Sequence, residues 1–323
     1  MKALITGGAG FVGSHLADLL IALGHEVWVL DDLSTGAMEN LNALREHERF
    51  HFQLGSVTDD SAVGELVDRV DTVFHLAAAV GVKLIVSNPV RTIETNVGGT
   101  ETVLRAARKN RKLVVLASTS EVYGKGVRVP FAEDDDLLLG PTTRSRWGYA
   151  CSKAIDEYLA LAYHREFELP VVIARLFNTV GPRQTGRYGM VLPTFVRQGL
   201  CAEDITVYGD GEQRRCFGDV FAVVKALERL AACQAARGGV FNVGCDREIS
   251  ILQLAELVRD MTGGNSRIVK IPYGEAYEEG FEDLGRRIPD VSRLQAMIGF
   301  HPDTPIETIV RNVIDSIEPP TRS

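Results

Sequence analysis

The sequence predicts an α/β fold in which a doubly wound parallel sheet is joined to a smaller mixed α/β segment. Short apolar runs alternate with amphipathic stretches through the first half of the chain, and a glycine-rich turn follows the first run. Such alternation is typical of parallel strands joined by helices in right-handed crossovers. The runs carry few charges, which indicates strands that are covered on both faces.

Each apolar run is assigned to a strand and each amphipathic stretch to a helix. The expected strands are 2–6, 26–30, 72–76, 113–118 and 171–176, with 240–244 as a late return strand of the same sheet. The expected helices are 11–23, 88–108 and 148–168, followed by others near 220–235, 250–262 and 305–317. From about residue 179 the loops lengthen and Gly, Pro and Arg become more frequent. We therefore expect one domain over 1–178, with a return over about 220–248, and a second segment over 179–323.

Composition excludes several function classes. The chain has 323 residues, of which 45% are hydrophobic and 24% charged, and its formal net charge of −8 argues against a nucleic-acid partner. No apolar run approaches the roughly 20 residues that span a bilayer, so no membrane partner is expected. The five cysteines are scattered, which predicts reduced thiols, no bound metal and a cytoplasmic setting. The acidic stretch 132–136 is expected to be a solvated loop.

The stretch TGGAGFVG (6–13) follows the first strand and opens the first helix. Gly7, Gly10 and Gly13 have the spacing that permits a tight turn, close approach of the backbone to a pyrophosphate, and close helix–strand packing. The helix N-terminus presents free N–H groups and a positive dipole end to the phosphates. In this strand–turn–helix context the glycines predict a Rossmann-type NAD site, to which Phe11 and Val12 of the same turn belong.

Acidic residues end the second expected strand. A carboxylate at Asp31 can accept hydrogen bonds from both ribose hydroxyls of NAD and would repel the additional phosphate of NADP. Asp32 follows it directly. The sequence therefore predicts NAD rather than NADP as the cofactor, the alternative role of Asp31 being a cap of the strand end.

Tyr149 and Lys153 lie at positions i and i+4 of an expected helix, so their side chains share one face. A phenol with a pKa of about 10 acts as a base at neutral pH only if that pKa falls, and a nearby ammonium together with the nicotinamide's positive charge favours this shift. The strand before this helix ends in hydroxyl and acidic side chains, which either face a substrate or cap the strand: Ser118, Thr119, Ser120 and Glu121.

Together these motifs resemble the extended short-chain dehydrogenase/reductases that act on nucleotide sugars. The resemblance extends over almost the whole chain, through TGGAGFVG, HLAA (75–78), NPVRTIETNVGGT (88–100), STSEVYG, YACSK, RLFNTVGPRQ (175–184), TVYGDGEQRRCF (206–217) and RRIPD (286–290). It implies that the tyrosine takes the proton of the sugar 4-hydroxyl while a hydride passes from carbon 4 to NAD. It also implies a homodimer formed through the helices around 88–108 and 148–168.

Within this group the sequence is most similar to UDP-glucuronate decarboxylases, as judged from ARLFNTVGPR, TVYGDGEQRRCF and RRIPD. By this resemblance Thr119 holds the sugar 4-oxygen, Glu121 orients the sugar or moves protons, and Arg287 holds the carboxylate or the diphosphate. Oxidation at carbon 4 produces a β-keto acid, which loses CO2 readily because the electrons flow into an enolate that the site stabilises by hydrogen bonds. The expected product is UDP-xylose or its 4-keto form.

Three alternatives stay open. The segment 75–84 is more similar to that of UDP-sugar 4-epimerases, which act on UDP-glucose or UDP-glucuronate. Nucleotide-sugar 4,6-dehydratases of the dTDP-glucose type have an aspartate where this chain has Ser120, which argues against that activity, although GDP-mannose dehydratases also carry Thr-Ser-Glu. A non-catalytic NAD-binding regulator is opposed by the intact Tyr149 and Lys153.

The expected sites combine the motifs with the resemblance. The catalytic set is Tyr149, Lys153, Thr119, Glu121, Ser120 and Arg287. The cofactor set is Gly7, Gly10, Phe11, Val12, Gly13, Asp31, Asp32, Leu76, Ala77, Ala78, Asn96 and Lys153. The substrate set is Asn178, Val191, Tyr208, Arg215 and Arg287, with Asn178 and Arg215 on the diphosphate and Tyr208 near the uridine. His75, inside an expected buried strand, is assigned a structural role.

Overall fold

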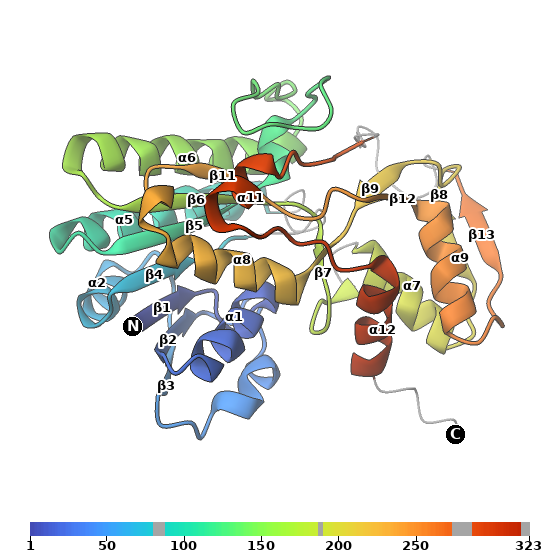
Figure 1. Cartoon of the computed structure of the whole chain (residues 1–323), viewed down its shortest axis with the longest axis horizontal. Coiled ribbons are helices and arrows are strands. Elements are labelled where there is room, and N and C mark those ends of the chain that lie inside the picture. Colours follow the sequence, from blue (N-terminus) through green and yellow to red (C-terminus); the bar gives the residue numbers. More distant parts are fainter. Residues whose placement is uncertain (80–87, 187–189, 273–285, 318–323) are drawn as a thin grey trace.

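The computed structural model describes residues 1–79, 88–186, 190–272 and 286–317. Its main body is a seven-stranded parallel sheet with the strand order β11-β6-β5-β4-β1-β2-β3 (Figure 1). The strands are β1 (Lys2–Thr6), β2 (Glu26–Asp31), β3 (Phe50–Leu54), β4 (Thr72–His75), β5 (Leu113–Thr119), β6 (Val171–Leu176) and β11 (Val240–Val243). The strand order reverses direction between β1 and β4, which is the point where doubly wound sheets bind ligands.

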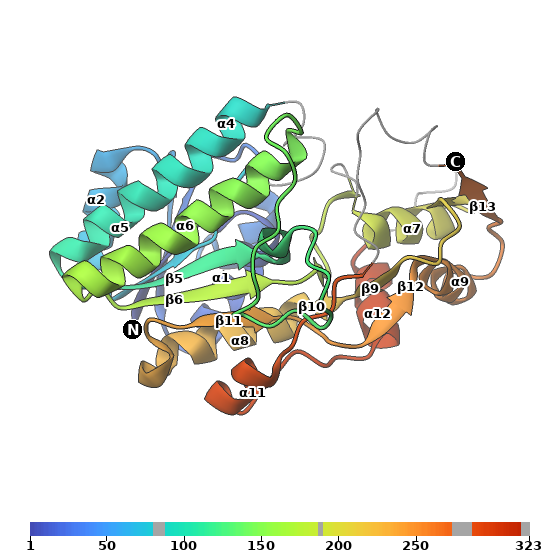
Figure 2. The same ribbon diagram turned by 90° about the horizontal axis from the view of Figure 1, so that it is seen from above.

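Helices cover both faces of this sheet (Figures 1 and 2). One face carries α1 (Phe11–Ala22), α8 (Val220–Ala232) and α11 (Ser292–Ile298). The other carries α2 (Asp60–Arg69), α5 (Gly99–Lys109) and α6 (Arg146–Phe167). Each face has its own apolar core, because strands such as β1 and β6 bury side chains on both sides. The sheet therefore holds the residues at the ends of its strands in fixed positions.

The second body is built around a separate apolar core. Its helices are α7 (Val191–Leu200), α9 (Ile251–Met261) and α12 (Ile306–Ser316). Its strands form short pairs: β8 (Ile205–Tyr208) with β13 (Ile268–Ile271), β9 (Arg214–Cys216) with β12 (Glu248–Ser250), and β7 (Thr179–Val180) with β10 (Gly218–Asp219). Helix α9 starts with a capping box, in which Ser250 and Gln253 satisfy each other's backbone N–H groups. The chain enters this body after β6 and returns to the main sheet for α8 and β11 (Figure 2).

The structure differs from the sequence-based expectations in several elements. Strand β3 was not expected, because it lies at the edge of the sheet and its polar His51 and Gln53 weaken the apolar signal. The short strand pairs of the second body were also not expected. The expected helix 88–108 is interrupted: α4 (Pro89–Ile93) and α5 are separated by a π-helical turn, η2 (Glu94–Gly98).

The expectation of a solvated loop over 132–136 is wrong for Glu133. Its side chain is buried, and Oε1 accepts a hydrogen bond of 2.8 Å from the backbone N–H of Asn242 in β11. A backbone donor in the sheet needs an acceptor, and this carboxylate supplies it.

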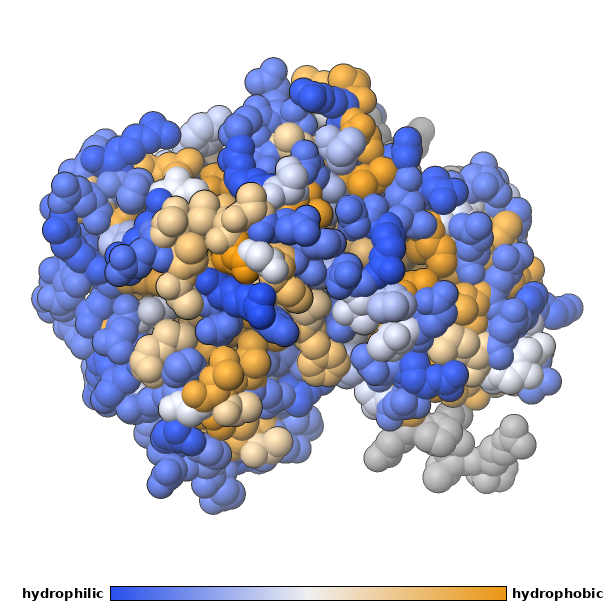
Figure 3. Space-filling view, viewed as in Figure 1, coloured by the Kyte–Doolittle hydropathy of each residue, from blue (hydrophilic) through white to orange (hydrophobic). Residues whose placement is uncertain are grey.

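No helix in the described part of the chain is long and apolar enough to cross a bilayer. Figure 3 shows polar side chains over most of one face of the molecule, with apolar side chains gathered over α1 and α8.

Candidate active site

The glycine-rich turn lies between β1 and α1 and leaves no room for side chains. Gly7 has a φ of +72°, and a Cβ there would lie 2.8 Å from the Cα of Ala77. A Cβ at Gly13 would lie 2.3 Å from the carbonyl oxygen of Gly7. Gly10 is the N-cap of α1 and provides no capping side chain, so the N–H groups of the first helical turn point out of the helix. A tight turn with uncapped donors fits the pyrophosphate of a dinucleotide.

Asp31 at the end of β2 holds this turn in place. Its Oδ2 accepts a hydrogen bond of 2.9 Å from the N–H of Ala9, and its Oδ1 accepts one of 2.8 Å from Leu33. Burial raises the pKa of Asp31, and these two backbone donors oppose the rise. Asp32 is more exposed and forms an ion pair of 3.7 Å with Arg91. Each carboxylate oxygen of Asp31 keeps a second lone pair, so the residue can support the turn and still accept ribose hydroxyls.

Replacing Gly13 by Ala should weaken NAD binding at least about tenfold, which is about 1.4 kcal/mol, because the new methyl group overlaps the Gly7 carbonyl oxygen. Gly64→Ala is the matched control, since a Cβ there meets nothing within 4 Å. Calorimetric titration of both variants with NAD measures the effect. An unchanged dissociation constant for Gly13→Ala would show that the pyrophosphate does not use this turn.

The remaining expected cofactor residues join the end of β4 to α6. Leu76, Ala77 and Ala78 follow β4, and Ala77 packs under the glycine turn. Asn96 lies in the π-helical turn, where its Oδ1 accepts a hydrogen bond of 2.9 Å from the N–H of Ala79 and its Nδ2 donates one of 3.1 Å to Ser152. Asn96 therefore ties the loop after β4 to the helix that carries Tyr149 and Lys153. Residues 80–84 of the epimerase-like segment lie outside the described residues.

Tyr149 lies in the first turns of α6, opposite the end of β5. Burial raises the pKa of Tyr149, and the charge of Glu121 raises it further. The hydroxyl of Thr119, which faces the phenol, opposes this rise, but the net effect is a raised pKa. The chain by itself therefore keeps Tyr149 protonated at neutral pH. The lowered pKa that the sequence analysis expects for the active base therefore depends on the positive charge of the bound nicotinamide.

Lys153 has a partner that the sequence analysis did not identify. Its Nζ lies 2.8 Å from Oδ2 of Asp156, and both side chains are almost fully buried. Asp156 follows Lys153 by three positions, a helical spacing that brings the two side chains together. The segment YACSKAID (149–156) carries this spacing.

Glu121 lies at the centre of a group of arginines. Its Oε1 accepts a hydrogen bond of 2.6 Å from Arg287, and its Oε2 lies 3.7 Å from Arg146. Burial raises the pKa of Glu121, but Arg287 and Arg146, with a smaller contribution from Arg215, hold it below the ordinary value. The structure thus brings together the expected residues Glu121, Arg287 and Arg215. Arg146 was not expected, although it precedes Tyr149 by three positions on the same helix.

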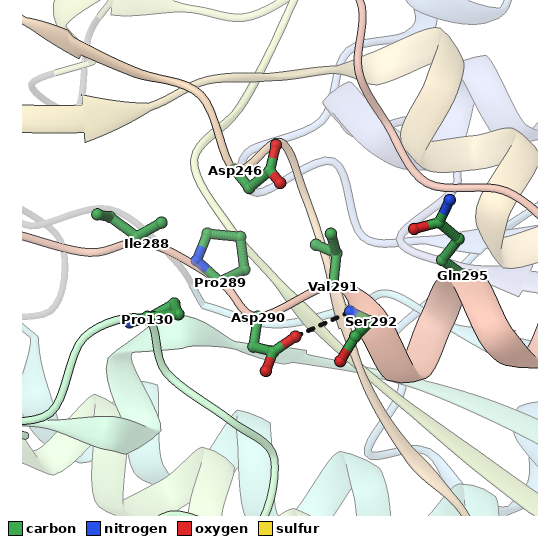
Figure 4. A pocket seen from close by; sticks show the side chains of 8 residues that line it. All are labelled: Pro130, Asp246, Ile288, Pro289, Asp290, Val291, Ser292 and Gln295. Carbon is green, nitrogen blue, oxygen red and sulfur yellow. Dashed lines mark hydrogen bonds between the residues drawn. The ribbon is translucent and has the colours of Figure 1, made fainter.

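Arg287 reaches this place because its segment is fixed to the main body. The N–H of Phe131 donates to the carbonyl of Ile288, and the N–H of Asp290 donates to the carbonyl of Phe131, both at 2.8 Å. Figure 4 shows Ile288 and Pro289 beside Pro130, with Asp290 accepting a hydrogen bond from Ser292. The Nε of Arg287 is buried and has no hydrogen-bond acceptor among the described residues. In the described part of the chain it is therefore an unpaired donor beside Glu121.

The remaining expected residues lie on β5, η3 (Ser120–Tyr123), α7 and β8 and in the segment that follows β6. Ser118 donates a hydrogen bond to Glu157 and is buried, so it supports α6. Ser120 is also buried, in η3. Asn178 donates its Nδ2 to the carbonyl of Cys216 at 3.0 Å, which joins the two bodies. Of the other substrate candidates, Val191 begins α7 and Tyr208 ends β8.

His75 is buried in β4, where its Nδ1 lies 2.8 Å from the hydroxyl of Thr6 and its Nε2 lies 3.1 Å from that of Thr100. Burial, followed by the charge of Lys153, lowers the pKa of His75 to about 3. A neutral imidazole with both nitrogens facing hydroxyls fits the structural role expected for it.

Comparison with known proteins finds nucleotide-sugar decarboxylases among the sequence relatives and a nucleotide-sugar epimerase among the similar structures. The model of the NAD dependent epimerase/dehydratase family matches residues 3–244. The UDP-N-acetyl-alpha-D-glucosaminuronate decarboxylase of Bacillus cytotoxicus is 42% identical over 97% of this chain and 96% of its own. UDP-glucuronic acid decarboxylase 1 of Xenopus tropicalis is 35% identical over 95% of this chain and 69% of its own. The structure of UDP-glucuronic acid 4-epimerase from Bacillus cereus, in complex with UDP-glucuronic acid and NAD, superimposes with a TM-score of 0.87 at 26% identity and covers 98% of both chains.

Proposed function

The chain belongs to the NAD dependent epimerase/dehydratase family, and we propose that it is an NAD-dependent decarboxylase of UDP-hexuronates, with UDP-glucuronate as substrate. The observation that carries the proposal is the pairing of Glu121 with Arg287, whose buried Nε lacks an acceptor among the residues that the structure describes. Buried donors in proteins are rarely left unpaired, and a guanidinium is suited to hold a carboxylate. A sugar carboxylate supplies the missing acceptor.

In this proposal the glycine turn, Asp31, Asn96 and Lys153 hold the cofactor. Bound there, NAD would supply the hydride acceptor for carbon 4 of the sugar and, once reduced, the hydride donor for its return. Tyr149 takes the proton of the 4-hydroxyl, and Thr119, whose hydroxyl faces the phenol, holds the 4-oxygen. Since the chain, with Lys153 in place, keeps Tyr149 protonated, the additional positive charge that makes it a base comes from the bound cofactor. This couples proton removal to cofactor binding.

Decarboxylation then follows from the position of the ketone. A ketone at carbon 4 is β to the carboxylate on carbon 6, so the C–C bond breaks with its electrons passing into an enolate of the ketone. Thr119 donates its hydroxyl hydrogen to the developing oxygen, and the protonated Tyr149 supports it. Arg287 orients the carboxylate before the bond breaks, while Glu121 keeps the arginine in place. A proton from solvent adds to carbon 5 in place of the lost carboxylate and gives the 4-keto pentose. Return of the hydride to carbon 4 and of the Tyr149 proton to the 4-oxygen would give the pentose.

The nucleotide end of the substrate is assigned to the segment 179–323. Asn178 and Arg215 are proposed to contact the diphosphate, with Tyr208 near the uridine and Val191 beside the sugar. Arg215 lies near enough to Glu121 to lower its pKa, which supports a position between the sugar and the diphosphate.

One comparison favours the UDP-linked 2-acetamido uronate, instead of UDP-glucuronate, as the substrate. The 42% identical relative is named as a decarboxylase of the 2-acetamido sugar, whereas the relatives named for UDP-glucuronate are 34–36% identical. Incubation with each uronate in the presence of NAD, followed by chromatography and mass spectrometry of the nucleotide sugars, distinguishes the two. We expect a UDP-pentose or its 4-keto form from UDP-glucuronate. A higher kcat/KM for the acetamido sugar would reassign the substrate, and UDP-galacturonate as the product would indicate an epimerase.

We propose that the chain forms a homodimer through α4 and α6, which pack against each other. Large apolar side chains are exposed in pairs one helical turn apart on each helix: Val90 (66%) and Ile93 (44%) on α4, and Ile155 (45%) and Tyr158 (69%) on α6. Such a patch is typical of an interaction surface, and a two-fold axis would pair α4 and α6 with their copies.

Tyr158→Glu should convert this dimer to a monomer, because it places a charge on the apolar patch. Light scattering coupled to gel filtration measures the mass. Phe221→Glu is the control, since Phe221 is also exposed but lies on α8, on the other face of the sheet. A monomeric parent protein would contradict the proposal.

The cytoplasm is the proposed location. All five cysteines are free thiols, and Cys216 and Cys245 are buried beside each other without a disulfide. Free buried thiols are typical of a reducing compartment.

A further inference from the structure

Lys153 is anchored by a carboxylate that no part of the proposed reaction uses. Asp156 is fully buried, and its Oδ2 lies 2.8 Å from Lys153 Nζ within the same helix. A buried carboxylate beside a buried ammonium neutralises much of that ammonium's field at other sites. The position of Asp156 therefore affects every group that depends on the charge of Lys153.

The surroundings hold this carboxylate in place, and their net effect is a raised pKa. Burial raises the pKa of Asp156, with a smaller rise from Glu157, while Lys153 and the hydroxyl of Thr100 lower it. Glu157 is itself bound to Arg175 of β6 and to Ser118 of β5, so its charge is compensated. Thr100 is positioned by His75, which is neutral. Asp156 is thus ion-paired with Lys153 in a polar layer between β4, α5 and α6.

Two acidic groups affect the pKa of Tyr149. Glu121 of η3 and Asp156 of α6 each raise the pKa of the phenol, after burial. Glu121 is compensated by ion pairs with Arg287 and Arg146. Asp156 is compensated by Lys153, which is the cation that the reaction needs at Tyr149. Asp156 is therefore one of the two acidic groups that oppose formation of the Tyr149 phenolate, and it also holds the ammonium of Lys153.

We propose that Asp156 is a positioning residue that anchors Lys153, offsets part of its charge, and thereby sets the pH at which the site becomes active. The inference rests on the proposed role of Tyr149 as the base. Removing the negative charge makes the phenolate easier to form, so the acid limb of the kcat–pH profile moves to lower pH. The sign follows from the linkage: a group whose pKa falls is deprotonated at a lower pH.

The test compares Asp156→Asn with Glu166→Gln, which makes the same charge change on the exposed surface of the same helix. With UDP-glucuronate and NAD, Asp156→Asn should shift the acid limb of kcat down by roughly half to one pH unit, while Glu166→Gln leaves it in place. Asp156→Glu, which restores the charge, should return the limb toward the parent position. Asp156→Ser provides the neutral variant if the asparagine variant does not fold.

A residue that only stabilises the fold would lower the melting temperature or kcat without moving the acid limb, and that result overturns the inference. Tyr149→Phe separates this failure from failure of the proposed function. If Tyr149→Phe is inactive and the limb of Asp156→Asn is unmoved, the inference alone is wrong. If Tyr149→Phe retains turnover, both are wrong.

Discussion

Tyr149→Phe should lower kcat by about 10²–10⁴-fold, since general-base groups contribute that range of rate, equivalent to about 3–5 kcal/mol of transition-state stabilisation. The substitution removes only the phenolic oxygen and leaves the partly buried ring in α6. NAD affinity and the unfolding temperature should therefore stay close to the parent values. Steady-state turnover with UDP-glucuronate, paired with a calorimetric NAD titration, measures both.

Tyr158→Phe is the matched control for this variant. Tyr158 lies on the same helix, but its side chain is exposed and remote from the end of β5. Its loss of the hydroxyl should leave kcat unchanged. A Tyr149→Phe protein with parental turnover would remove Tyr149 from the catalytic set and favour a different base.

Arg175→Met should destabilise the protein by about 3–5 kcal/mol, because it leaves a buried carboxylate without its cation. Arg175 in β6 donates to both carboxylate oxygens of Glu157 in α6, at 3.0 Å from Nε to Oε1 and 2.7 Å from Nη2 to Oε2. Burial opposes the charged form of Arg175, but the bonds to Glu157 outweigh it and raise its pKa. Urea unfolding at neutral pH measures the loss.

Two further variants make this result interpretable. Arg267→Met breaks an exposed pair with Asp204 and should leave the urea midpoint close to that of the parent protein. The double variant Arg175→Met with Glu157→Leu removes both buried charges and should recover part of the loss. If Arg175→Met is as mild as Arg267→Met, the pair does not hold α6 against the sheet.

The sequence predicted the parts of the fold that depend on local pattern. The central strands and α1 follow from apolar runs and the glycine turn, which are contiguous signals. Edge strand β3 and the short strand pairs of the second body depend on tertiary pairing, so their local patterns are weak. The π-helical turn at Asn96 was also missed, because nothing in a helical pattern marks one inserted residue.

The candidate site shows the same division between features with a local sequence pattern and features that depend on tertiary contacts. Tyr149, Lys153 and the glycine turn carry spacings that can be recognised within one segment. The proximity of Glu121 and Arg287 was suggested by resemblance alone, since 166 positions separate them along the chain. Asp156 and Arg146 were missed although each lies three positions from a named residue. An i,i+3 spacing on a helix is too common to single out without knowing which face is buried.

The electrostatics of the site were the least predictable part. The sequence suggested that Lys153 and the bound nicotinamide lower the pKa of Tyr149, but it gave no sign that burial and Glu121 raise that pKa in the folded chain. Desolvation depends on packing from β5, η3 and α6 together, which no local pattern encodes. The consequence is a base that becomes active only when positive charge is added to the site.

Decarboxylation is the central claim, and the fate of carbon 6 tests it most directly. UDP-glucuronate labelled with carbon-13 in its carboxyl group is incubated with the enzyme and NAD, and the label is followed by NMR. The account predicts that the label appears as CO2 and bicarbonate at the rate at which UDP-glucuronate disappears, with an unlabelled UDP-pentose or its 4-keto form as the sugar product. A label that stays on a nucleotide sugar, as in UDP-galacturonate, would contradict it.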